Sequence, residues 1–333
     1  LTLDRCKELA RRGYGALSFP ADCGGESDLG KFIAVFEELA IYDLNLVVKY
    51  GVQFGLFGGS ILFLGTEKHH VKYLPEVGTL DLPGCFAMSE LGHGSNVRQL
   101  MTTATFDRKS DCWVIRTPDD IARKEWIGNA AVDGRLATVF AQLIIGNEEY
   151  GVHAILVPIR GQDGKPMPGV RIEDCGEKMG LNGVDNGRLW FDNVKVPREN
   201  LLDRYAQVDR DGSYTSEILS PDKRFFTMLG TLVGGRVSVA AAGNSAAKTA
   251  LTIAIRYSAI RRQFGPAGQP EVPILDYRTH QRRLLPLLAK TYALHFALRH
   301  LQERYIDRSP ESMREVEGLA AALKATSTWH ATE

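Results

Sequence analysis

The residues best suited to chemistry lie in the stretch GCFAMSELGHGSN (Gly84–Asn96), where a strand-like run ends on a Ser-Glu pair and a small turn. Side chains alternate along a strand, so Ser89 faces the opposite side of the sheet from the residue before it. The turn glycines allow close approach to the backbone, and turn amides with the Ser95 hydroxyl can bind an anion. The stretch therefore predicts a heteroaromatic ring edge at Ser89 and a phosphate or carbonyl at the Gly94 turn. Its composition fits a plain strand-ending turn with a solvated Glu90 equally well.

A second candidate lies in ARKEWIGNAA, where the large flat ring of Trp126 stands beside the small residue Gly128. Such a ring can form one wall of a site for a planar cofactor. Large aromatic rings are also common in protein cores. Taken alone, this stretch favours a core aromatic.

Two cationic positions stand in the C-terminal third of the chain. Arg261 ends a long helical run next to Phe264 and a Gly/Pro loop. The positive charge of Arg261 can interact favourably with the C-terminal end of the helix dipole. Alternatively, Arg261 can bind a phosphate while Phe264 lies against a base. Arg236 falls within the apolar run LVGGRVSVAA, which predicts a buried guanidinium that needs a partner.

Three regions must position these residues. Residues 1–82 show helical spacing of apolar residues, and residues 83–205 show short β-rich runs divided by Gly, Pro, Asn and Asp. Residues 217–333 contain long apolar helical runs typical of a bundle, which is incomplete at the end of the sequence. We therefore predict an α+β multidomain protein with an N-terminal helical domain, a central β-barrel or sandwich, and a C-terminal helical bundle.

Composition excludes several classes of protein. Lys+Arg and Asp+Glu both total 40, so no charge excess indicates nucleic acid or a membrane surface as a partner. The five cysteines are scattered without a CxxC pair, which favours buried thiols in a reducing compartment and no metal site. GxGxxG, GxxxxGK[ST] and HExxH are all missing. The apolar stretch Tyr50–Gly65 is too short to cross a bilayer comfortably and predicts a buried helix or helix pair.

Three longer signatures, in this order, resemble those of the acyl-CoA oxidases within the acyl-CoA dehydrogenase/oxidase superfamily. They are CFAMSELGHGSNVRQLMTTATFD, GLNGVDNGRLWFDNVKVPRENLLDRYAQVDRDGSYTS and TIAIRYSAIRRQFG. The resemblance extends over nearly the whole chain. It implies FAD as the cofactor and a fatty acyl-CoA thioester as the substrate.

The resemblance also implies roles for particular residues. Phe86, Met88 and Ser89 match the strand along the flavin, with the Ser89 hydroxyl at the ring edge. The other implied FAD contacts are Gly94, Ser95, Trp126 and Gly128, together with Arg261 and Phe264, which reach the FAD of a neighbouring subunit. Ser95 also matches a contact to the pantetheine arm, and Arg236 matches the arginine beneath the acyl site. A homodimer or higher homo-oligomer is therefore implied.

The implied reaction is α,β-dehydrogenation, in which a carboxylate removes the α-proton and the β-hydrogen leaves as hydride. In the family the carboxylate is a glutamate just before a Cys-Gly-Gly turn, which is expected beyond Glu333. Some relatives carry it beside the arginine that matches Arg236, but Gly235 occupies that place here. The sequence is thus expected to be a fragment without the catalytic base.

The leading expectation is the FAD- and acyl-CoA-binding portion of an acyl-CoA oxidase of fatty-acid β-oxidation, which gives trans-2-enoyl-CoA and passes electrons to O₂ to form H₂O₂. One alternative is an acyl-CoA dehydrogenase that passes electrons to an electron-transfer flavoprotein. Another is a non-catalytic flavin or acyl-CoA binding protein. The bacterial cytoplasm is the expected location, with the peroxisome as the alternative.

Overall fold

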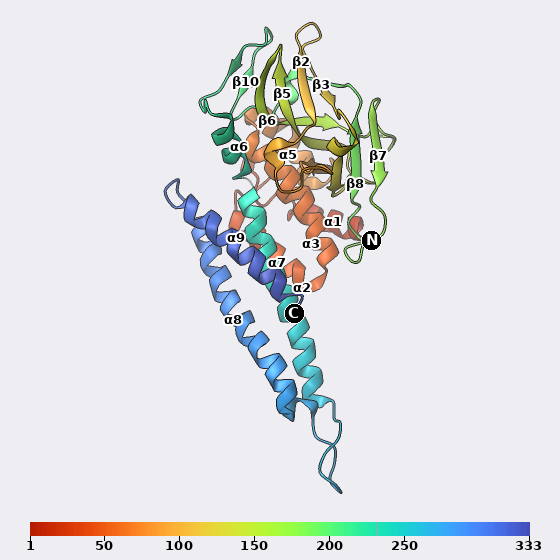
Figure 1. Cartoon of the computed structure of the whole chain (residues 1–333), viewed down its shortest axis with the longest axis vertical. Coiled ribbons are helices and arrows are strands. Elements are labelled where there is room, and N and C mark those ends of the chain that lie inside the picture. Colours follow the sequence, from red (N-terminus) through yellow and green to blue (C-terminus); the bar gives the residue numbers. More distant parts are fainter. Residues whose placement is uncertain (231) are drawn as a thin grey trace. The chain divides into compact units, whose positions relative to one another are not determined.

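The computed structural model describes residues 1–230 and 232–333, which form two compact units. The first unit holds Leu1–Asp28 and Asn45–Leu232, and it contains all the β-strands (Figure 1). The second unit joins Leu29–Leu44 to Val233–Glu333 and is helical. The mixture of helices, sheets and long C-terminal helices confirms the predicted α+β class. The division at residues 1–82, 83–205 and 217–333 stays a prediction.

Among the described residues, the first unit contains five α-helices and one π-helical segment. They are α1 (Thr2–Arg11), α3 (Leu44–Tyr50), the π-helical segment η2 (Gly51–Phe57), α4 (Gly58–Leu64), α5 (Glu67–Thr79) and α6 (Pro221–Leu229). The run from α3 to α4 is apolar and long enough to span a membrane by composition, and most of it is buried inside the structure. A second such run, Pro221–Ile260, is half buried. The predicted buried helix over residues 50–65 is therefore confirmed.

Two sheets share one core in the first unit. The larger sheet has the order β1-β5-β2-β3-β9, with β6 paired to β5, and the smaller has the order β4-β8-β7. Their bounds are β1 (Gly84–Ala87), β2 (Thr103–Asp107), β3 (Cys112–Arg116), β4 (Lys124–Ile127), β5 (Leu136–Ile145), β6 (Glu148–Pro158), β7 (Val170–Asp174), β8 (Gly187–Phe191) and β9 (Val194–Pro197). A short pair, β10 (Gln207–Val208) and β11 (Tyr214–Thr215), stands apart. Trp113 from the larger sheet and Phe191 from the smaller belong to one buried cluster, as in a sandwich.

Among the described residues, four α-helices make up the second unit. They are α2 (Leu29–Tyr42), α7 (Leu232–Ile260), α8 (Arg278–Ile306) and α9 (Met313–His330). Ile33 of α2 belongs to the same buried cluster as Val237 of α7, Leu301 of α8 and Val316 of α9. Lys248 donates to Glu37 Oε1 at 3.1 Å, which adds a polar tie between α7 and α2. The predicted C-terminal helical bundle is confirmed, and it includes one helix from near the N-terminus.

The predicted burial of Arg236 was wrong, because its side chain is exposed. Val233, Val237 and Ala240 form the buried stripe of α7, with helical spacing. Arg236 falls at the margin of that stripe, where a long side chain reaches water while its stem covers apolar surface. It therefore needs no buried partner.

The buried side chain of His153, on β6, gives the fold a pH-dependent stability. Its Nδ1 lies 3.0 Å from the Gly151 carbonyl, which can only accept, so this nitrogen carries the proton. Nε2 then accepts from the Tyr214 hydroxyl at 3.0 Å. Burial lowers the pKa of His153 to about 4 from 6.5, because the imidazolium would lose its hydration.

We expect this histidine to remove about 3 kcal/mol of unfolding free energy as the pH falls from about 6.5 to about 4. The unfolded chain binds the proton over that range and the folded chain does not, so stability decreases with acid. Urea denaturation at a series of pH values measures the effect. His153→Gln should flatten the curve, whereas exposed His300→Gln should leave it unchanged. Equal curves for wild type and His153→Gln would contradict the assignment.

Candidate functional site

A cavity of about 380 Å³ in the first unit brings together most of the residues singled out in the sequence. Six of them line it, namely Phe86, Met88, Ser89, Gly94, Trp126 and Gly128. The helical run from α3 to η2 contributes Val48, Val52 and Leu56, and a loop before β8 contributes Val184 and Asn186. The volume falls in the range of small-molecule sites, roughly 300–1,000 Å³. The cavity is mostly apolar with a few polar groups.

Strand β1 and the residues just after it form one wall of the cavity. β1 runs parallel to β5. The ring centroids of Phe86 on β1 and Phe140 on β5 are 4.8 Å apart. Ser89 Oγ donates to the Glu125 carbonyl at 3.0 Å, which uses the only proton of the hydroxyl. The Ser89 oxygen can still accept a hydrogen bond from a ligand.

The turn after Ser89 uses most of its amides internally. Those of Glu90 and His93 bond across the turn, and those of Leu91 and Gly92 donate to carbonyls of residues 123 and 121. Within the described ranges, the amides of Gly94 and Ser95 have no hydrogen-bond partner. A Cβ placed on Gly94 would meet nothing within 4 Å. The amides free to bind an anion are therefore those at Gly94 and Ser95, although Ser95 does not line the cavity.

Glu90 is buried, so the alternative of a solvated Glu90 is wrong. Its carboxylate accepts from the amides of Met101 and Thr102 at 2.7 and 2.9 Å and from the Thr102 hydroxyl at 2.6 Å. Lys124 Nζ lies 3.0 Å from Glu90 Oε1, and both side chains have 0 % exposure. The pair lies directly behind the wall that carries Ser89.

The two partners of this pair differ in how well the protein solvates them. Burial raises the pKa of Glu90, but Lys124 and the donors at Thr102 and Met101 outweigh it, and the net pKa lies below the usual range. Burial lowers the pKa of Lys124 to about 8, because its other contacts are the neutral carbonyls of Met88 and Phe140. Glu90 therefore carries its charge more readily than Lys124. No sequence motif indicated this pair.

Trp126 does not lie in the core, contrary to what its stretch alone favoured. Its side chain is 56 % exposed, and its backbone has a φ of 63°, which is unusual for a bulky residue. Asn186 Nδ2 donates to the Trp126 carbonyl at 2.9 Å. A Cβ on Gly128 would lie 2.9 Å from Val52 Cγ2, so glycine permits the close approach of loop and helix. The surrounding structure holds a strained residue at an irregular part of strand β4, where its indole lines the cavity.

The remaining predicted site residues belong to the second unit. Arg261 Nη2 donates to Gln263 Oε1 at 3.0 Å, and Phe264 is 72 % exposed with a φ of 57°. Both lie in the region between α7 and α8, and Arg236 lies on α7. None of the three lines the cavity of the first unit.

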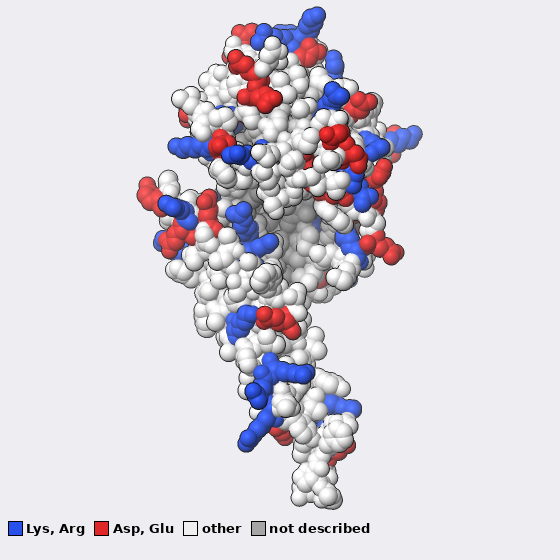
Figure 2. All heavy atoms as spheres, viewed as in Figure 1, with Lys and Arg blue, Asp and Glu red and all other residues white. Residues whose placement is uncertain are grey.

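The face of the first unit seen in Figure 2 carries no patch of a single charge sign. On the face in Figure 2, acidic and basic side chains are interspersed over the part that holds the sheets. In the part of the chain that the structure describes, no group of three or more His, Cys, Asp or Glu side chains is placed to hold a metal ion.

Three family descriptions match this chain in order. "Acyl-CoA dehydrogenase, N-terminal domain" matches residues 2–81, and "Acyl-CoA dehydrogenase, middle domain" matches residues 85–194. "Acyl-CoA oxidase, C-alpha1 domain" matches residues 229–333.

Individual relatives agree with this order. Acyl-coenzyme A oxidase 2, peroxisomal, of Arabidopsis thaliana is 52% identical over 309 residues, which are 90% of this chain and 45% of that protein. The crystal structure of acyl-CoA oxidase1 from Yarrowia lipolytica has a TM-score of 0.87 at 36% identity and covers 99% of this chain and 49% of that one. Acyl-CoA oxidase-2 of Caenorhabditis elegans, bound with FAD, ascaroside-CoA and ATP, has a TM-score of 0.74 at 28% identity, covering 98% and 54%.

The chain thus spans about half the length of the relatives it matches. Its N-terminal helices, middle β-sheets and C-terminal helices form an acyl-CoA dehydrogenase-like fold. Together with the oxidase match of its C-terminal helices and the high identity to named oxidases, this shows that the chain belongs to the acyl-CoA oxidase family.

Proposed function

We propose that this chain is the flavin-binding portion of an acyl-CoA oxidase that converts fatty acyl-CoA to trans-2-enoyl-CoA and reduces O₂ to H₂O₂. One observation carries the proposal. In a member of this family, six residues chosen from the sequence for a flavin site meet in one cavity. A relative with the same fold is titled as bound with FAD.

The cavity suits a planar, mostly apolar ring system with polar edges. Trp126 offers an exposed indole face and Met88 a polarizable side chain. Ser89 can accept a hydrogen bond at the ring edge, and the amides of Gly94 and Ser95 are available to a phosphate. FAD bound here would supply a two-electron acceptor for the hydride.

Glu90 cannot serve as the base that takes the α-proton. Its carboxylate has 0 % exposure and is occupied by Thr102, Met101 and Lys124. We therefore assign it to support of the cavity wall. A glutamate beyond Glu333 remains the prediction from the family resemblance.

The assembly and location follow from the same proposal. We propose a homodimer or larger homo-oligomer in which exposed Arg261 and Phe264 reach the FAD of a neighbouring subunit. Ser95 would contact the pantetheine arm, and Arg236 would lie near the acyl site. Relatives named as peroxisomal favour the peroxisome over the bacterial cytoplasm that was first expected.

The full-length gene product is expected to bind FAD and to lose its visible flavin band when acyl-CoA is added without air. Admission of air should restore the band with about one H₂O₂ per flavin. Slow recovery without peroxide would indicate a dehydrogenase that needs an electron-transfer flavoprotein. A flavin that acyl-CoA leaves oxidised would indicate a binding protein, and a protein that refuses FAD would contradict the whole proposal.

A further inference from the structure

One helical run presents two neighbouring rows of side chains to different parts of the first unit. Val48, Val52 and Leu56, four residues apart, line the cavity. Lys49 lies in the next row, and its side chain is 3 % exposed. Residues four apart share a helix face, so the two rows move together with the helix.

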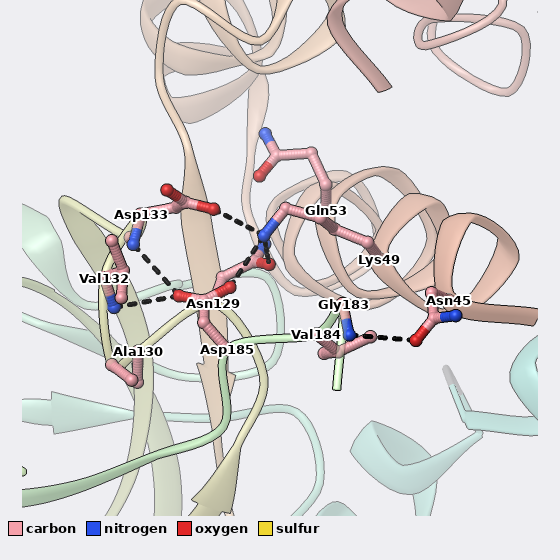
Figure 3. Close-up of polar contacts among 12 residues, drawn as sticks. Asn45, Lys49, Gln53, Asn129, Ala130, Val132, Asp133, Gly183, Val184 and Asp185 are labelled. Carbon is pink, nitrogen blue, oxygen red and sulfur yellow. Dashed lines mark hydrogen bonds and ion pairs between the residues drawn. The ribbon is translucent and has the colours of Figure 1, made fainter. Parts of the chain in front are cut away.

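The Lys49 row ties the helix to two loops (Figure 3). Lys49 Nζ donates to Asn129 Oδ1 at 3.0 Å, to Asp133 Oδ2 at 2.5 Å and to Asp185 Oδ1 at 2.7 Å. An ammonium group has three protons, so these contacts satisfy it completely. One turn earlier, Asn45 Oδ1 accepts from the Gly183 amide at 2.9 Å.

Each loop that Lys49 binds continues directly into a cavity wall. Asn129 follows Gly128, and Asp185 stands between Val184 and Asn186. Asp185 Oδ2 also accepts from the amides of residues 132 and 133, which joins the two loops to each other.

The strand wall is connected to the same network. Asn129 Nδ2 donates to the Gly84 carbonyl at 2.9 Å, and the Gly84 amide donates to Gln53 Oε1 at 2.9 Å. Asn129 is 1 % exposed and has a φ of 65°. Its partners stabilise this unusual backbone conformation. Gln53 stands one turn after Lys49 in the same row of the helix.

The Lys49 ammonium is held charged despite its burial. Burial alone would lower its pKa, but Asp185 and Asp133 outweigh burial and raise the pKa above its usual value. The attraction draws two separate loops toward one point on the helix. The contacts of Lys49 therefore fix the distance between these two loops and the helix face that lines the cavity.

We propose that Lys49 is a positioning residue that sets the gap between the helix wall and the two loop walls, and thereby the fit of the cavity to the isoalloxazine ring. This rests on the proposed flavin function. The cavity loses its match to a flat ring when the loops around Asn129 and Asp185 relax away from the helix.

The test uses the full-length apoprotein and two readings. FAD titration, followed by visible absorbance, should show about tenfold or more weaker binding for Lys49→Met. Hydrogen exchange without FAD should be about tenfold or more faster at the amides of Val132 and Asp133, with strand β5 unchanged. Arg198→Met is the control, because it removes a different cation, 24 % exposed, that contacts a carboxylate, Asp111, at 2.8 Å. It should leave FAD affinity within about threefold.

Lys49→Arg is the second variant, for the case that Lys49→Met does not fold. The planar guanidinium keeps the charge but cannot reproduce three contacts arranged around an ammonium, so FAD affinity should still fall. Wild-type FAD affinity in either folded variant overturns the proposal. If the wild type itself refuses FAD, the flavin function fails instead, and unchanged exchange at Val132 and Asp133 in the variants would then refute the positioning role.

Discussion

Lys124→Met is expected to lower the unfolding free energy by about 3–5 kcal/mol, the usual cost of removing one partner of a buried ion pair. The substitution leaves the Glu90 carboxylate, with 0 % exposure, without its cation. It also leaves the carbonyls of Met88 and Phe140 without a donor. Urea denaturation followed by circular dichroism measures the loss.

A double variant separates the lone charge from the loss of packing. Glu90→Gln combined with Lys124→Met should recover a substantial part of the loss, because no uncompensated charge then remains buried. The neutral amide can still accept from the Thr102 amide. If the double variant is as unstable as the sum of the two single variants, the pair is not coupled as the structure implies.

Gly84→Ala is the second substitution with a large expected effect, because a Cβ there would lie 2.1 Å from Phe57 Cε1. Phe57 is fully buried and cannot swing into water. Overpacking of this kind costs about 1–3 kcal/mol. The strain also displaces β1, so weaker FAD binding should accompany the loss of stability. Thermal denaturation and FAD titration of the same sample measure both.

Two further variants test whether the clash with Phe57 causes the loss of stability. Gly180→Ala adds a methyl group where nothing lies within 4 Å, and it should change stability by less than about 0.5 kcal/mol. Phe57→Leu should partly rescue Gly84→Ala, because the smaller side chain makes room for the new methyl group. Equal losses for the Gly84 and Gly180 variants would contradict the close packing of β1 on η2.

Local patterns were sufficient to predict the order of helices, sheets and helices. The family resemblance, rather than local pattern alone, singled out six of the residues that line the cavity. Met88, Ser89 and Gly128 stand in short stretches whose alternation or glycine content is visible in the sequence. The burial of individual side chains was harder to predict, because it depends on which other elements pack over them. The alternative of a plain turn placed Glu90 in solvent, but it is buried. The local patterns of Trp126, taken alone, and of Arg236 favoured the interior, but both side chains are exposed.

The contacts of Lys49 could not be predicted from spacing. Its three partners stand 80, 84 and 136 residues away along the chain. A lysine in an otherwise apolar helix is a signal that a partner exists, since a buried ammonium needs one. No nearby sequence feature indicates which carboxylates pair with this lysine. The same holds for Lys124, whose chain neighbour Glu125 instead pairs with Arg188.

The helix α2 has a consequence for how the protein is made. Glu37 meets Lys248, which stands 211 residues later in the chain. At synthesis rates of about 5–20 residues per second, α2 leaves the ribosome roughly 10–40 s before its partner exists. During that delay Ile33 lacks the partners of its buried cluster, so the nascent chain exposes an apolar face of α2. Binding of a chaperone to this helix would protect the nascent chain from aggregation until α7, α8 and α9 emerge from the ribosome.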